Sequence, residues 1–336
     1  MSVNLAASVY KRLRDVGLTK PYVKKVALPT WWEDSLAENT AGFAQFLMLL
    51  SRFLGIDLRT LQDSKAALHL RDFGVCKYKR REGTTEDELA LSRVIATRAA
   101  QLAGAAMERP YQPVPGASDI RLSILDRARW VGFEDLLDYC WAHGIPVLHI
   151  DVFPPHAKRA DGFTLRLHGR PVIVLCRKDK QPSWLLFILA HELGHIGSGH
   201  IPEDGALLDE RPLENQPDQE EDEANRFALE LLTGRPRTSI SIDGRWPNAR
   251  HLAELAMQFA RRNAVDPGHV VLNYAHSMGP GFFAVARGAL KVLYPDADAI
   301  RIVRDKLAEN LDWELLPEDS SEFLMRMTRQ SQESDE

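Results

Sequence analysis

The sequence predicts an α+β fold that is mostly helical, in which a small sheet packs on one central helix and helical regions flank both. Residues 184–200, WLLFILAHELGHIGSGH, form an apolar run with His and Glu at helical spacing. Three short apolar runs, at 145–150, 163–167 and 171–176, precede it and have the length and composition of strands. Segments with helical periodicity occupy most of the remaining chain. We therefore expect the other elements to pack around the helix at 184–200.

Composition narrows the class of protein. The 336 residues suffice for two or three folding units, and 45% hydrophobic with 26% charged residues is typical of a soluble globular protein. No apolar run approaches the ~20 residues that span a bilayer, and we see no signal-peptide pattern. The three widely spaced cysteines, Cys76, Cys140 and Cys176, form no disulfide framework. These observations predict a cytoplasmic protein without a membrane partner.

Charge and composition divide the chain into four predicted parts. They are a basic helical N-terminal region at 1–82, a metal domain at 83–235, a helical C-terminal region at 236–329 and a disordered tail at 330–336. Residues 1–81 hold 14 Lys and Arg against 7 Asp and Glu, a balance of +7, whereas the whole chain has a formal net charge of −5. The two halves are therefore expected to meet different partners.

The N-terminal region contains a possible helix-turn-helix at 13–26, with Gly17 in the turn. Its predicted packing positions are Val16, Leu18, Val23 and Val26. Its predicted DNA-facing side chains are Lys20, Lys24 and Lys25. The alternative is an interaction or regulatory bundle that uses Trp31, Trp32 and the apolar helix predicted at 41–54.

In the metal domain we expect helices at 85–107, 120–129 and 133–143, followed by a buried strand at 145–150. Residues 163–167 and 171–176 should form a hairpin that turns at 168–170. An edge strand of this sheet could pair with an extended substrate peptide. The C-terminal region should contain helices at 249–262, 266–274, 282–293 and 297–311.

The central helix carries the pattern HExxH. His191 and His195 lie one turn apart on one face, the arrangement that binds zinc, and Glu192 lies beside them. A carboxylate in that position can act as general base on a metal-bound water. Two imidazoles and a carboxylate would be costly to bury in this apolar run without a partner, which favours a Zn²⁺ site.

The third zinc ligand must come from elsewhere. His200 does not fit the metzincin pattern, because Ser198 and Ile201 stand where that pattern needs a glycine and a histidine. We expect the ligand to be Glu223, which shares a helical face with Phe227, and Glu220 is the fallback. Glu221 and Asp222 are predicted to point away. Cys176 is expected to be a buried strand residue, with a thiolate that closes the fourth zinc position as the alternative.

HELGH followed by the helix E-x-E-A-N-x-F-A-x-x-L-L resembles the ImmA/IrrE family of gluzincin-like zinc peptidases, over residues 125–235. The resemblance implies zinc bound by His191, His195 and Glu223, with Glu192 as catalytic base. Family members typically cleave or inactivate a helix-turn-helix repressor or antitoxin in a stress, DNA-damage or mobile-element response. The chain departs from the family at Thr233 and Gly234, where a methionine-proline pair is common.

These features predict a zinc-dependent endopeptidase whose substrate is a repressor or antitoxin protein. The alternatives are a DNA-binding transcription regulator, or an interaction protein that sequesters the repressor, each with a zinc domain that cleaves nothing. The intact Glu192 favours the peptidase, because a purely structural site needs no base.

Overall fold

A computed structural model describes residues 5–70, 76–78, 86–154, 160–201, 205–208, 219–237, 240 and 248–329. The tail predicted at 330–336 lies outside these residues. The fold is α+β and mostly helical, as predicted. None of the helices in the described segments is long and apolar enough to cross a membrane.

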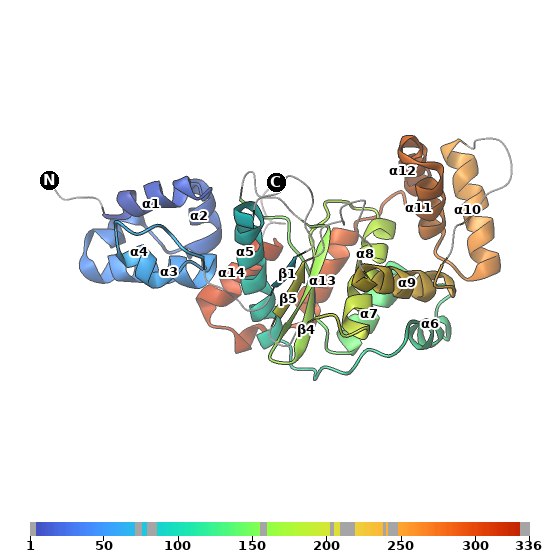
Figure 1. Cartoon of the computed structure of the whole chain (residues 1–336), viewed down its shortest axis with the longest axis horizontal. Coiled ribbons are helices and arrows are strands. Elements are labelled where there is room, and N and C mark those ends of the chain that lie inside the picture. Colours follow the sequence, from blue (N-terminus) through green and yellow to red (C-terminus); the bar gives the residue numbers. More distant parts are fainter. Residues whose placement is uncertain are drawn as a thin grey trace.

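A mixed sheet lies at the centre (Figure 1). In the order β1-β5-β3-β4-β2, its strands are Cys76–Tyr78, Gly205–Leu208, Gly162–Leu167, Arg170–Leu175 and Val147–His149. β3 and β4 form the predicted antiparallel hairpin. Its turn consists of His168 and Gly169, which both have positive φ, of 50° and 77°, as a two-residue type I′ turn requires. β2 runs parallel to β4 and is buried along its length.

Helices cover both faces of the sheet. Thr164 of β3 points to α8 (Pro182–Gly197), where its hydroxyl reaches Glu192. Val172 of β4 occupies the opposite face, since it pairs with Leu165, and it lies against Gly104 of α5 (Glu86–Ala105). α9 (Gln219–Thr233) packs along α8, on the side away from the sheet. The metal-motif helix is therefore held between the sheet and a second helix.

β3 is not free to receive a peptide. Its outer edge pairs with β5, in the register Thr164 to Leu207, and β5 in turn pairs with β1. The edges of the sheet are thus β1 and β2. Substrate pairing with an edge strand stays a prediction.

The N-terminal helices α1 (Leu5–Asp15), α2 (Lys20–Ala27), α3 (Thr40–Leu54) and α4 (Leu58–Gln62) lie at one end of the molecule. They pack on α14 (Glu318–Thr328), where Phe53 stacks on Phe323 with ring centroids 4.8 Å apart. Gly17 has a φ of 87°, as expected for the turn between α1 and α2. Leu18, Val23 and Val26 are buried, but Val16 is 43% exposed, so its predicted packing role is wrong.

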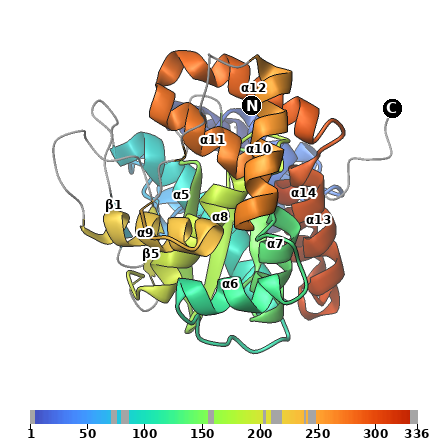
Figure 2. The same ribbon diagram turned by 90° about the vertical axis from the view of Figure 1, so that its right-hand side faces the viewer.

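The C-terminal helices divide between two apolar cores. α10 (Ala249–Asn263), α11 (Pro267–Met278) and α12 (Phe283–Leu293) form a core of their own at the other end of the molecule (Figures 1 and 2). α13 (Ala299–Asn310) and α14 return to the main core, where α13 packs on β2. The remaining helices, α6 (Ala117–Leu125) and α7 (Phe133–Ala142), lie beside α9 and α8. The domain division drawn from the sequence stays a prediction.

Candidate metal centre

α8 begins at Pro182, which is well suited to a first helical position because its missing N–H needs no partner there. Most residues of α8 are buried, because the motif lies within an apolar stretch of the helix. His191, Glu192 and His195 are 6%, 1% and 0% exposed. Polar groups buried this deeply require partners, and the partners come from α9, β3 and the end of α8 itself.

The carboxylate beside the two histidines belongs to Glu221, and the prediction that Glu221 points away is wrong. Glu221 is 5% exposed, and its Oε1 lies 3.1 Å from Nε2 of His195. The sequence argument took the large Phe227 as the marker of the buried face. Phe227 does lie against Gly194 and Gly197 of α8, but this side of α9 also carries the small residues Ala224 and Ala228, which are fully buried. Glu221 lies one turn before Ala224 on this stripe.

His191, His195 and Glu221 each offer one atom to a common point, all within 4.8 Å of one another. The two Nε2 atoms are 3.0 Å apart, and Glu221 Oε2 is 3.5 Å from Nε2 of His191. Tetrahedral zinc with bonds of about 2.0–2.2 Å separates neighbouring donors by roughly 3.3–3.6 Å. The distance of 3.5 Å falls within this range, and those of 3.0 and 3.1 Å are slightly shorter. The three side chains thus have the donor types of a zinc site and lie close to its tetrahedral spacing. The described residues supply three donors to this group, the number that a catalytic zinc site takes from its protein when water or substrate fills the fourth position.

Asn225, one turn after Glu221, orients the first histidine. Its Oδ1 lies 3.2 Å from Nδ1 of His191. Because an amide oxygen can only accept, Nδ1 carries the proton and the Nε2 lone pair faces the cluster. Asn225 was not predicted as a site residue. The spacing E-x-x-x-N, which places an acid and an acceptor on one helical face, was the available signal.

Glu192 is held by the sheet. The hydroxyl of Thr164 donates to its Oε2 at 2.7 Å. Gly162, at the start of β3, allows this approach, since a Cβ there would lie 2.6 Å from Cγ2 of Ile188 and 3.0 Å from Oε1 of Glu192. A buried carboxylate next to the metal cluster, with one oxygen fixed by a hydroxyl, is a suitable general base. Neither Thr164 nor Gly162 was foreseen, because strand-to-helix contacts leave no local pattern.

The other metal ligands considered from the sequence are Glu223, Glu220 and Cys176. Glu223 lies against His200, with Oε2 3.0 Å from its Nε2, and not against the two histidines of the motif. Hydrogen bonds from Gln219 and His200 hold the pKa of Glu223 below its ordinary value. Cys176 is buried, as expected, and directly follows the last residue of β4. Among the described residues, neither Cys176 nor Glu220 belongs to the group that could hold a metal.

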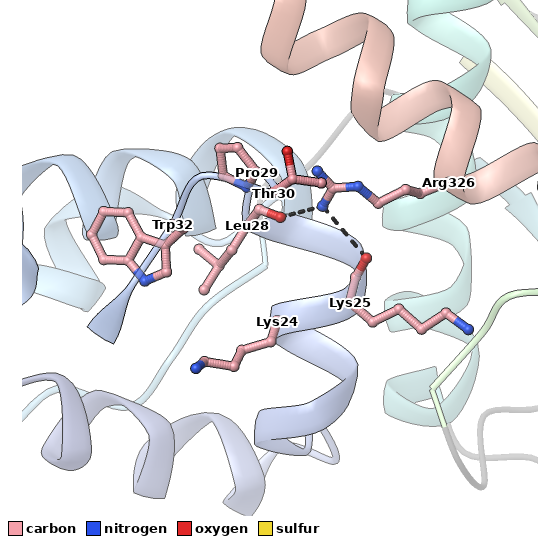
Figure 3. A pocket seen from close by; sticks show the side chains of 7 residues that line it. All are labelled: Lys24, Lys25, Leu28, Pro29, Thr30, Trp32 and Arg326. Carbon is pink, nitrogen blue, oxygen red and sulfur yellow. Dashed lines mark hydrogen bonds between the residues drawn. The ribbon is translucent and has the colours of Figure 1, made fainter. Parts of the chain in front are cut away.

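A separate hollow of about 250 Å³ lies between α2 and α14 (Figure 3). It is lined by Lys24, Lys25, Leu28, Pro29, Thr30, Trp32 and Arg326. Lys24 and Lys20 both bind Asp34, at 3.1 and 2.7 Å. Arg326 donates to the carbonyl of Leu28 and pairs with Glu322. Two of the three lysines expected to face DNA thus share their charge with an acidic neighbour.

An HExxH helix against a mixed sheet, with a glutamate supplied by a second helix, is the arrangement of a zinc metallopeptidase-like protein. The sequence model of Peptidase_M78, described as the IrrE N-terminal-like domain, matches residues 140–256, which include α8 and α9. This part of the chain is similar to that domain, so the resemblance to ImmA/IrrE peptidases is confirmed. No curated protein and no solved structure matches the chain.

Proposed function

We propose that this protein is a zinc-dependent endopeptidase in which His191, His195 and Glu221 hold the metal and Glu192 is the catalytic base. The observation that carries the proposal is the burial of Glu192 directly beside a cluster with three donors. A structural zinc site would have four protein donors and no use for a base. Two imidazoles and one carboxylate grouped this closely suit Zn²⁺ better than Mg²⁺ or Ca²⁺, which prefer oxygen donors.

Zinc in this site would lower the pKa of a bound water to about 7 and polarise a peptide carbonyl. Glu192 would accept the proton as water attacks and pass it to the leaving amine. The hydroxyl of Thr164 donates to Oε2 of Glu192 and so fixes the orientation of the carboxylate beside the cluster. Asn225 keeps the ring of His191 in the tautomer that the metal needs.

The substrate proposal rests on the family. We propose that the peptide belongs to a helix-turn-helix repressor or antitoxin, cleaved in a stress, DNA-damage or mobile-element response. DNA binding by the N-terminal region is the second proposal for a partner, but the pairing of Lys20 and Lys24 with Asp34 adds no support to it. The peptidase is therefore the function to test first.

The test is metal content and cleavage in matched variants of the full chain. Wild type should hold one zinc per chain by elemental analysis, and Glu221→Gln should hold little, because it replaces a ligand. Asp222→Asn, on the exposed side of α9, is the control and should bind zinc as wild type does. Glu192→Gln should keep its zinc and fail to cut a repressor that wild type cuts. A Glu192→Gln variant that regulates its partner as well as wild type would replace the peptidase with the binding-protein alternative.

A further inference from the structure

We infer that His200 and Glu223 are positioning residues for the metal ligand His195, linked to it as a chain of hydrogen bonds Glu223–His200–His195. This inference rests on the metal site proposed above. It assigns a role to two side chains that do not themselves bind the metal. The chain would hold the ring of His195 in one orientation and one tautomer, and so tighten the binding of the metal.

The end of α8 brings His200 back to His195. Gly199 adopts a left-handed conformation, with a φ of 73°. The N–H of His200 bonds to the carbonyl of His195 at 3.0 Å, and the N–H of Gly199 bonds to the carbonyl of Ile196 at 3.2 Å. These two bonds form a Schellman motif, in which Gly199 is the left-handed residue. In this motif the side chain of the next residue, here His200, contacts the side chain five positions earlier, here His195. That contact is usually apolar, but here it joins two imidazoles.

The ring contacts continue to α9. Nδ1 of His200 lies 2.9 Å from Nδ1 of His195, and Nε2 of His200 lies 3.0 Å from Oε2 of Glu223. Oε1 of Glu223 accepts from Gln219 at 2.9 Å, which fixes the carboxylate at its other end. His200 is 7% exposed, so its ring has little access to water. The chain therefore runs from a partly exposed carboxylate to the buried ligand.

The proton positions follow from the donor inventory. A carboxylate only accepts, so Nε2 of His200 donates to Glu223. In a neutral ring the Nδ1 of His200 is then the acceptor, and Nδ1 of His195 donates to it. This leaves Nε2 of His195 with a lone pair, directed at His191 and Glu221, 3.0 and 3.1 Å away. When the rings of His195 and His200 are both neutral, this assignment satisfies both hydrogen bonds of His200 and leaves Nε2 of His195 able to bind a metal.

Glu223, the ligand predicted from the sequence, contacts His200. It follows Glu221 by two residues and acts on the same centre, but through His200 and His195. Outer partners of metal ligands typically change affinity by about 10–100-fold when they are removed, whereas loss of a ligand itself costs far more. The two roles for Glu223 therefore predict different magnitudes.

The experiment measures zinc affinity of the full chain by competition with a chromophoric chelator, with the free zinc ion as the probe. We expect Glu223→Gln and His200→Phe to weaken zinc about 10–100-fold. His200→Gln should recover part of the loss, because its amide oxygen can accept from Nδ1 of His195. Asp222→Asn should match wild type, and Glu221→Gln should bind too weakly to measure.

Two further readouts separate positioning from a loss of folding. The melting temperature of the metal-free variants should stay close to that of metal-free wild type. The visible absorption bands of the Co²⁺-loaded protein should shift in Glu223→Gln and His200→Phe, because the donor strength of His195 changes, and keep their four-coordinate intensity.

Each alternative outcome overturns a different statement. Zinc affinity within twofold of wild type in both Glu223→Gln and His200→Phe would remove the positioning role and leave the metal site intact. Loss of zinc in Glu223→Gln as complete as in Glu221→Gln would make Glu223 a ligand. Failure of wild type itself to bind zinc would overturn the proposed function, and this inference with it.

Discussion

Gly194 of α8 lies in direct contact with the backbone of Ala224 of α9. A Cβ on residue 194 would be 3.0 Å from the carbonyl oxygen of Ala224 and 3.1 Å from its Cα. The same Cβ would be 3.1 Å from Cβ of Phe227. The glycine of HELGH thus sets how closely the two helices approach. Because Glu221 lies one turn before Ala224, this approach also sets the distance between Glu221 and the two histidines.

Gly194→Ala should therefore destabilise the protein and weaken metal binding together. In an ordinary helix the change would stabilise by up to about 1 kcal/mol. Here we expect a net loss of about 1–3 kcal/mol in the free energy of unfolding, because overpacking forces α8 and α9 apart. Urea denaturation and zinc competition measure the two effects. Gly281→Ala, where a Cβ meets nothing within 4 Å, is the matched control. An unchanged zinc affinity in Gly194→Ala would contradict the link between helix distance and the site.

The parts of this protein that the sequence predicts well are those with a local pattern. His191 and His195 meet because four residues make about one helical turn, and β3 and β4 pair because a two-residue turn joins them. The third carboxylate depends instead on how α9 rotates against α8. The four positions 220–223 are all acidic, and the large Phe227 favoured Glu223, whereas the structure places Glu221 beside the two histidines.

The strands β1 and β5 were missed for a related reason. They have three and four residues. β1 pairs with β5, and β5 pairs with β3, in each case across a long stretch of chain. Strands this short have little periodicity to detect, and their pairing is decided by non-local contacts. Val16, in the turn after α1, is a further example. An apolar residue in a turn can be buried or exposed, and the local sequence does not distinguish the two.

Thr164→Val should slow catalysis without loss of metal. Valine has nearly the same shape, but it cannot donate to Oε2 of Glu192, so the carboxylate loses its fixed orientation. Hydrogen bonds to charged groups are worth about 1.5–3 kcal/mol, so we expect kcat for a protein substrate to fall roughly 10–100-fold. Steady-state kinetics and zinc content measure this. Thr164→Ser keeps the hydroxyl and should retain most of the activity. An equal loss in the serine variant would attribute the effect to packing.

Arg121→Met should be strongly destabilising. The guanidinium of Arg121, on α6, is 8% exposed and donates to the carbonyls of Leu231 and Leu232 at the end of α9, at 3.1 and 2.8 Å. It also donates to Ala264, the C-cap of α10, at 2.6 Å. Burial lowers the pKa of Arg121 from its ordinary value. Methionine fills similar space but leaves these carbonyls without their donor, at about 1–3 kcal/mol for each buried group.

We therefore expect Arg121→Met to lower the free energy of unfolding by at least about 3 kcal/mol, measured by urea denaturation. Arg127→Met, a change of the same type at an exposed position just after α6, is the control and should cost little. If the two variants lost equal stability, the carbonyl contacts of Arg121 would not be its main contribution.

Two neighbouring groups at the start of α11 have pKa values shifted in opposite directions. Asp266 accepts from the backbone N–H of His269 and from the hydroxyl of Tyr294, but burial raises its pKa to about 6. Burial lowers the pKa of His269 to about 4, and neither of its ring nitrogens has a hydrogen-bond partner among the described residues. The ring stacks on Phe187 instead, with centroids 6.1 Å apart.

The signs of the two contributions follow from which state holds more protons. As the pH falls from 6.5 to 4, the unfolded chain protonates His269 before the folded protein does, so this group makes the protein less stable. As the pH falls from 6 to 3.8, the folded protein protonates Asp266 first, so this group makes the protein more stable. In wild type the two trends oppose each other near pH 5.

Single substitutions should expose each trend. Relative to wild type at the same pH, His269→Leu should gain stability as the pH falls from 6.5 to 4, by up to about 3 kcal/mol, since one pKa unit is worth about 1.4 kcal/mol. Asp266→Asn, which keeps a helix-capping side chain, should lose stability by a similar amount as the pH falls from 6 to 4. Urea unfolding at pH 4, 5 and 6.5 measures both differences. Differences from wild type that stay constant with pH would show that each group has the same pKa in the folded and the unfolded protein, and would contradict the shifts caused by burial.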